Sequence, residues 1–321
     1  MSDTAVTPAP LAEAPVVAWR RAGYVLFDHA VRAGASALLA LPVVGAIRGT
    51  GITQLPSGDR ALFEPGGLML LETVRALLPQ TGGLVTGALL TGFAFAALLV
   101  VPHGILLSAL SRGERRPVSQ VVAEAVPRLP ALYSLAALGF LLKCLLFALC
   151  FTLAGFARDA VAGSNPRTQD LVFVAVAALG TLAWIAGGAL TDLARAACVD
   201  GRHGVRDAAL GAFGVLAARP LRIAACYALY CACALGLVAA TGALVSQLDV
   251  ARPETARFAA VAVLHQLVAL GLAFLRAAVL AETLALVSAR RRRSSADTSA
   301  DSDVPGDPSS NPAASVDGAA G

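Results

Sequence analysis

Five ionisable side chains stand inside long apolar stretches of this chain, where they could bind or relay charge. They are Lys143, Asp192, Arg195, Arg276 and Glu282. An ionisable group at membrane depth is costly, so each is a candidate functional residue. At 1.5 Å per helical residue, Lys143 lies roughly 18 Å from the nearer end of its stretch, close to the middle of a bilayer.

Two interpretations account for these residues. In the first they form a polar pathway, in which Lys143 and Arg276 bind an anion while Asp192, Glu282 or a histidine relays protons. In the second they are compensating pairs, Lys143 with Asp192 and Arg276 with Glu282. Asp192 and Arg195 are three residues apart and could also pair on one helix face. We favour structural pairs, because burial demands pairing whether or not anything is transported.

Motifs for catalysis, metal binding and nucleotide binding are absent from the sequence. There is no G-x-S-x-G, no H-E-x-x-H and no Walker spacing. His103 and His265 have no third ligand at a suitable spacing, so we expect hydrogen-bonded bundle residues rather than metal ligands. Aromatic residues make up only 6% of the chain, which argues against a nucleic-acid surface. We expect no enzyme activity, no cofactor and no metal.

The composition is that of a membrane protein. The 321 residues are 57% hydrophobic and 14% charged, with a mean hydropathy of +0.72, whereas soluble domains carry about 25% charged residues. Several apolar runs exceed the roughly 20 residues that cross the hydrocarbon core as a helix. The fold predicted is therefore an all-α, polytopic transmembrane helical bundle. Its six predicted spans are about 30–48, 84–111, 131–155, 171–198, 221–246 and 258–288.

Arginines predict the orientation of the bundle. Fourteen lie on the side that holds both termini, against seven on the other side. The positive-inside rule therefore places both termini in the cytoplasm. Of the 25 basic residues only Lys143 is a lysine, and alanine, glycine and valine dominate. This bias suggests a GC-rich genome and favours a bacterial cytoplasmic (inner) membrane.

The segments around the spans have different expected states. Residues 1–15 are acidic and carry prolines, and residues 294–321 have no large apolar side chain other than valine, so we expect disordered tails, the second of them acidic, on either side of a membrane domain over 16–293. Residues 65–79 have apolar positions on one face and predict an outer amphipathic helix.

A repeat organises the membrane domain. The apolar spacing over 117–129 recurs over 204–217, with position 118 matching 205, and each segment predicts an inner-face amphipathic helix. Each is followed by a proline and a new apolar span. A weaker third copy precedes the first span. We therefore expect three helix-plus-hairpin units, at about 15–112, 113–200 and 201–293.

This layout, together with the connector "DGRHGVRDAALGAF" at 200–213, resembles that of uncharacterised bacterial six-span membrane proteins. These include relatives of the membrane domain of glycerophosphodiester phosphodiesterases. The resemblance covers 15–293 and implies an integral inner-membrane protein. It carries no phosphodiesterase activity to this chain, because no cluster of His, Glu and Asp with metal-ligand spacing accompanies it.

Membrane lipids are the expected partners, and the connectors carry the residues that would contact them. Basic groups beside a span attract anionic headgroups. The candidate contacts are Arg112, Arg115, Arg116, Arg202, Arg206, Arg290 and Arg291. We expect a non-enzymatic envelope or lipid-associated scaffold; the alternative is a small-solute or ion transporter that uses the mid-membrane charges. An intramembrane enzyme is the least favoured reading.

Overall fold

The protein is an all-α bundle in the computed structural model, and no strand occurs among the described residues. The structure describes residues 13–49, 81–111, 116–161, 163, 165–201, 204–247 and 255–302. The predicted fold class is confirmed. The predicted outer helix at 65–79 lies outside the described residues.

Six of the described helices are long and apolar enough to cross a membrane, as the sequence predicts. Most extend several residues beyond the predicted spans, because helices continue past the hydrocarbon core into the interface. They are α2 (Ala22–Gly49), α4 (Thr81–Leu110), α6 (Leu129–Ala160), α7 (Pro166–Val199), α9 (Pro220–Ser246) and α10 (Thr255–Ser302).

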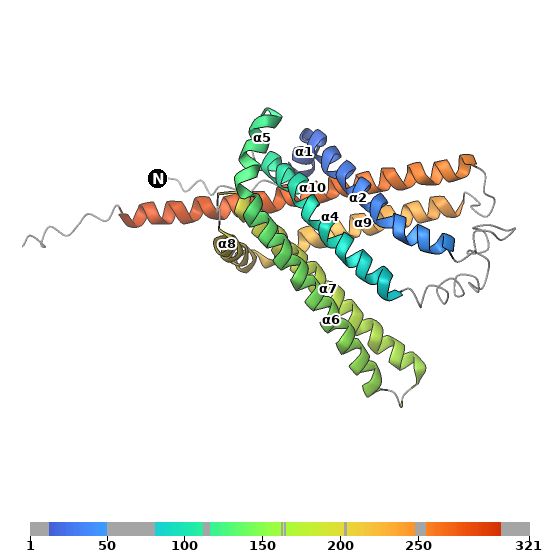
Figure 1. The fold of residues 1–321 in the computed structure, drawn as a ribbon. Helices are drawn as coiled ribbons and strands as arrows, with labels where there is room; N and C mark the ends of the chain where they lie inside the picture. The colour runs from blue at the N-terminus through green and yellow to red at the C-terminus, as the bar shows by residue number, and fades with distance from the viewer. Residues whose placement is uncertain are drawn as a thin grey trace, which may run out of the picture.

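Three short helices lie at one end of the bundle, which we call the short-helix end (Figure 1). They are α1 (Glu13–Arg20), α5 (Val118–Ala125) and α8 (Val205–Ala218). Helix α5, extended by the 3-10 turn Val126–Arg128, and helix α8 confirm the predicted amphipathic helices at 117–129 and 204–217. Helix α1 stands where the weaker third copy was expected.

Prolines set where two of the spans begin. Pro130 is the second residue of α6 and Pro220 the first of α9. Proline has no N–H to donate and a φ angle already suited to a helix, so it fits this first turn. Each amphipathic helix therefore passes into its span with almost no connecting loop.

The boundaries of both predicted tails need correction. Helix α1 begins at Glu13, inside the predicted tail 1–15. The burial of Ala14 and Ala18 offsets the conformational entropy that this turn loses when it becomes ordered. Helix α10 continues to Ser302, beyond the predicted start of the second tail at 294. Extending an existing helix needs no new nucleus, so polar residues can prolong it into water.

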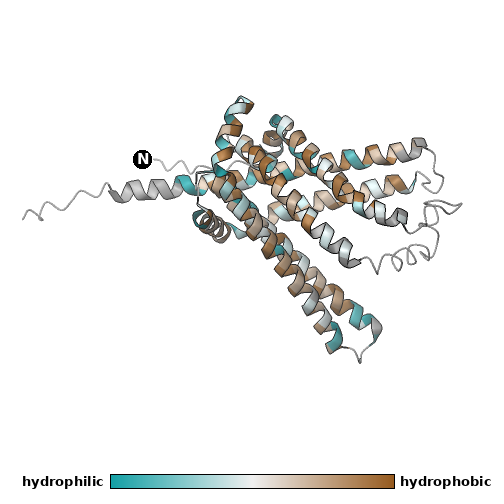
Figure 2. Ribbon diagram, viewed as in Figure 1, coloured by the Kyte–Doolittle hydropathy of each residue, from teal (hydrophilic) through white to brown (hydrophobic). Residues whose placement is uncertain are grey.

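The buried core lies towards the short-helix end. Leu107 of α4, Leu193 of α7 and Leu280 of α10 are fully buried there. The α6–α7 hairpin runs away from the other long helices, and its tip stands apart from them (Figure 1). Leucines along this hairpin, such as Leu145 and Leu179, are exposed, and apolar residues dominate it up to its polar tip (Figure 2). Such a surface suits hydrocarbon rather than water.

Gly201 ends helix α7 with a positive φ of 116°, a conformation that glycine adopts without steric cost. The guanidinium of Arg291 on α10 donates to the carbonyl of Asp200, the residue that caps helix α7. Ser288, also on α10, donates to the Asp200 carboxylate at 2.9 Å. These contacts hold this part of α10 against the turn after α7.

Replacing Gly201 with alanine should lower the free energy of unfolding by about 1–2 kcal/mol, because an L-residue is strained at this φ. Thermal unfolding in detergent measures the change. Gly236→Ala in α9 is the control, since nothing lies within 4 Å of its added methyl group. Equal stability of the two variants would show that the turn does not need glycine.

Candidate functional site

Asp192 is the centre of a buried polar cluster that joins three long helices. Its side chain on α7 is 2% exposed. It accepts a hydrogen bond from the Tyr227 hydroxyl of α9 at 2.6 Å and one from the Arg276 guanidinium of α10 at 2.5 Å. Both carboxylate oxygens are therefore used, and the charge of Arg276 is compensated inside the bundle.

Glu282 forms a second buried ion pair. Its side chain is 3% exposed and lies 2.5 Å from Arg222 of α9, near the short-helix end. The Nε of Arg222 also donates to the same oxygen, at 2.9 Å. Together with the Asp192 cluster, this pair fixes α10 against its neighbours.

The pairing therefore differs from the one expected. Both carboxylates are paired, but the predicted partners are wrong: Arg276 pairs with Asp192 and not with Glu282. Within the described part of the chain, Arg195 has no carboxylate at ion-pair distance. The reason is geometric. Residues of one helix that are six apart, such as Arg276 and Glu282, point to different sides, whereas packed neighbouring helices bring side chains together.

Lys143 has an aromatic partner instead of the expected carboxylate. Its ammonium lies 5.7 Å from the centre of the Trp184 ring of α7. The negative face of an aromatic ring attracts a cation, and this attraction is stronger where water is scarce. Lys143 can therefore carry its charge on α6, and the N–H groups of its ammonium remain available to donate to another group.

Lys143 and Arg195 line one cavity, with Arg32 and His103. Its volume is about 210 Å³, and it lies between the hairpin of α2 and α4 and the hairpin of α6 and α7. We call it the cation cavity. Thr191 and apolar residues complete its wall; the apolar residues are Ala96, Leu99, Val100, Leu132, Ala136, Gly139 and Phe140.

The cations stand at different depths. Counted along each helix from the short-helix end at about 1.5 Å per residue, Arg195 lies about 6 Å in, Arg32 about 15 Å and Lys143 about 21 Å. The cavity is not sealed, since Phe140 is 39% exposed and the Arg32 side chain 42% exposed. The cavity thus places a row of positive charges beside an apolar wall, and the cavity is open to the outside of the bundle.

Only one of these cations has a carboxylate beside it. Arg32 pairs with Asp28, one turn earlier on α2, at 2.6 Å. No carboxylate of the described residues lies within 4 Å of Lys143 or Arg195. An uncompensated charge is costly inside a membrane, so this arrangement favours an anionic ligand in the cavity.

Sequence reasoning missed Arg32, Asp28, Arg222 and Tyr227. Asp28 and Arg32 precede or barely enter the predicted first span, and Arg222 is grouped with the connector arginines, so neither arginine was counted as intramembrane. The spacing of Asp28 and Arg32, four residues apart on a helix, is a signal that could have found that pair.

The arginines predicted to contact lipid have varied surroundings. Arg116 pairs with Glu124 at 2.5 Å, Arg290 donates to the carbonyl of Gly214, and Arg291 caps α7 as described above. Arg206 is exposed on α8. The other three, Arg112, Arg115 and Arg202, lie outside the described residues.

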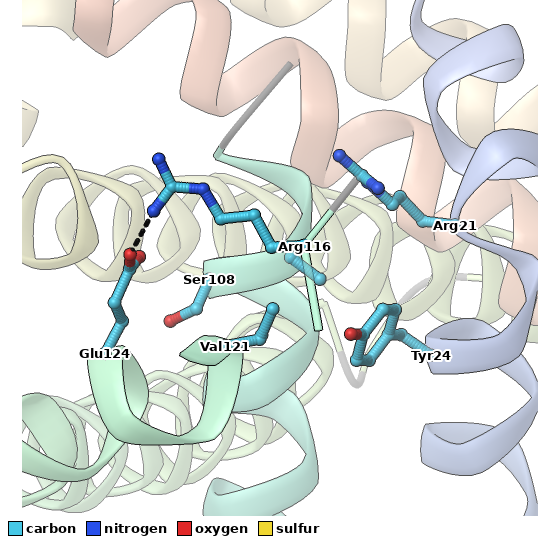
Figure 3. Close-up of a pocket in the computed structure, with 7 residues that line it drawn as sticks. Arg21, Tyr24, Ser108, Arg116, Val121 and Glu124 are labelled. Atoms are coloured by element: carbon cyan, nitrogen blue, oxygen red, sulfur yellow. Dashed lines mark hydrogen bonds and ion pairs between the residues drawn. The ribbon is translucent and has the colours of Figure 1, made fainter. Parts of the chain in front are cut away.

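A second, much smaller cavity lies at the short-helix end between α2, α4 and α5. Figure 3 shows Arg116 turned towards Glu124 and away from the Ser108 side chain, with Arg21 and Tyr24 on the opposite wall. Its volume is about 10 Å³, which is room for about one water molecule. It is too small for a solute or a headgroup.

The two histidines of the spans differ. His103 is buried on α4 and lines the cation cavity, whereas His265 is exposed on α10. Among the described residues, no group of His, Cys, Asp and Glu could hold a metal ion.

No family model, curated protein or solved structure matches this chain.

Proposed function

We propose that this chain is a non-enzymatic, lipid-associated protein of a bacterial cytoplasmic membrane that binds an anionic lipid in the cation cavity. The single observation that carries the proposal is that Lys143 and Arg195 line one cavity with an apolar wall, while no carboxylate of the described residues lies within 4 Å of either cation. An anionic headgroup would supply the missing charge, and the acyl chains would lie along the apolar wall and the exposed hairpin.

The topology supports the same setting. The arginine bias puts the short-helix end in the cytoplasm, with both termini. Helices α1, α5 and α8 each lead into a pair of long helices, and we take these as three repeated units. The cavity then lies between the first two units and opens within reach of cytoplasmic-leaflet lipids, which are rich in anionic headgroups.

Transport of a small anion is a second candidate, and the different depths of the cations favour it. Of the residues predicted for a pathway, Lys143 remains available to a solute, and Arg195, which was not predicted for it, lines the same cavity. Asp192, Arg276 and Glu282 are held in ion pairs. A pathway would therefore run through α2, α4, α6 and α7 rather than through α10.

The test is the lipid that copurifies with the full-length protein. We expect native mass spectrometry in mild detergent to find bound phosphatidylglycerol on the wild type. The double variant Lys143→Gln/Arg195→Gln should retain at most about one tenth of that lipid, because each charged hydrogen bond contributes about 1.5–3 kcal/mol.

The matched control is Arg158→Gln/Arg167→Gln, which removes two exposed arginines near the tip of the same hairpin. It should retain the lipid. Equal retention by both double variants would contradict the proposal. Anion uptake by liposomes that contain the wild type, lost in Lys143→Gln, would instead favour the transport function.

A further inference from the structure

Among the described residues, the second helix of each hairpin carries one buried acidic or basic side chain, and the first two of these stand at matching positions. These residues are His103 on α4, Asp192 on α7 and Glu282 on α10. His103 stands seven residues before the end of its helix at Leu110, and Asp192 stands seven residues before Val199. Two of the three positions hold a carboxylate paired with an arginine. The first position holds a ring without negative charge.

The hydrogen bonding of His103 fixes which ring nitrogen carries the proton. Its Nδ1 lies 3.4 Å from a terminal nitrogen of Arg32. A guanidinium only donates, so Nδ1 accepts, and the proton of the neutral ring is on Nε2. This Nε2 is buried and has no hydrogen-bond partner among the described residues. His103, one of the residues that line the cation cavity, thus holds an unused, buried donor.

The three cations of the cavity are donors as well. The guanidinium and ammonium groups of Arg32, Lys143 and Arg195 have no acceptor atoms. The Thr191 hydroxyl uses its proton on the Gly187 carbonyl at 2.8 Å and offers the cavity no donor. A ligand with acceptor atoms in several directions satisfies such a wall, and a phosphate group has three or four acceptor oxygens.

We infer that the cation cavity is a phosphate site, in which the ligand takes the place of the carboxylate that the second hairpin carries at the position matching His103. The phosphate is held by Lys143 and Arg195, with the Nε2 proton of His103 as a neutral third donor. This inference rests on the proposed function and adds the chemical class of the ligand and the role of His103. The phosphate comes from a lipid headgroup or from a free ion.

A carboxylate built into this position should close the site. His103→Asp reproduces the carboxylate of the second hairpin and should pair with Arg195 or Arg32. We expect the ligand-free variant to unfold at a higher temperature than the ligand-free wild type, and its affinity for phosphate to fall about tenfold or more. Ala136→Asp introduces a carboxylate from the α6 wall of the cavity and should weaken binding in the same way. Thr168→Asp, which adds a carboxylate at an exposed position near the tip of the α6–α7 hairpin, is the matched control and should keep the affinity.

The experiment uses the delipidated full chain with three probes, and it records thermal unfolding and native mass spectra. The probes are nanodiscs of phosphatidylglycerol in phosphatidylcholine, nanodiscs of phosphatidylcholine alone, and inorganic phosphate. Stabilisation by phosphatidylglycerol alone identifies a lipid headgroup, and stabilisation by inorganic phosphate identifies a free ion. Either result supports the phosphate site. If none of these probes stabilises the wild type more than the others do, the proposed function itself is contradicted.

The inference fails separately if the wild type binds a phosphate-bearing probe and both cavity aspartate variants bind it equally well. Nitrogen NMR of the histidine ring provides a test on the wild type alone, so it does not depend on whether any variant folds. The Nε2 resonance of His103 should show a protonated nitrogen that shifts when the phosphate probe is added. A His103 signal that does not respond to a bound probe would overturn the assignment of its role.

Discussion

Asp192→Asn should be the most damaging single substitution in the bundle, with a loss of about 3–5 kcal/mol in the free energy of unfolding. Removing one partner of a buried ion pair leaves the other charge uncompensated. Here Arg276 would lose its carboxylate, and the Tyr227 hydroxyl would keep only a neutral acceptor. Thermal or denaturant unfolding in detergent measures the loss.

A double-mutant cycle separates this ion pair from other effects of the substitution. Asp192→Asn/Arg276→Gln should regain much of the stability lost in Asp192→Asn, since no buried charge remains. Glu124→Gln is the matched control: it removes the carboxylate of a more exposed pair, whose side chains are 36% and 25% exposed, and should cost about 1 kcal/mol or less. Additive losses in the double variant would mean that the two residues are not coupled.

Gly180→Ala should be the most damaging of the small-residue substitutions along the α6–α7 hairpin. An added Cβ would lie 2.6 Å from the Cβ of Cys150 and still closer to its sulfur, on the facing helix. The two helices pack at this point because the glycine leaves room for the thiol. Overpacking of this kind costs about 1–3 kcal/mol, which unfolding measurements would record.

Gly188→Ala is the matched control, two turns further along the same helix. Nothing lies within 4 Å of its added methyl group. Alanine also favours a helix over glycine by about 1 kcal/mol, so this variant should be as stable as the wild type or more stable. If Gly180→Ala were equally well tolerated, the close packing of α6 against α7 would be wrong.

The fold was largely predictable because its signals are local. Span length and hydropathy predict the six long helices, and the apolar spacing after positions 117 and 204 predicts α5 and α8. The ends of α1 and α10 were not predictable in the same way. The start of α1 depends on the burial of Ala14 and Ala18, and the end of α10 at Ser302 on the extension of a helix that is already formed.

The site was only partly predictable. Lys143, Asp192, Arg195, Arg276 and Glu282 all stand out as ionisable residues in apolar stretches, but their partners depend on which helices meet. The sequence does not show that Asp192 faces α9 and α10 while Arg195, less than one turn away, faces the cavity. Nor does it show that Lys143 meets Trp184, because ring and cation come from different helices.

The central claim is that the cation cavity binds an anionic phosphate, and the sequence offers a direct probe of it. Lys143 is the only lysine of the chain, so a lysine side-chain nitrogen label marks this single site. In membranes containing phosphatidylglycerol, solid-state NMR of the nitrogen–phosphorus coupling should place a phosphate on the order of 4 Å from the Lys143 ammonium, and the coupling should disappear in Arg195→Glu. No detectable coupling in the wild type would contradict the account.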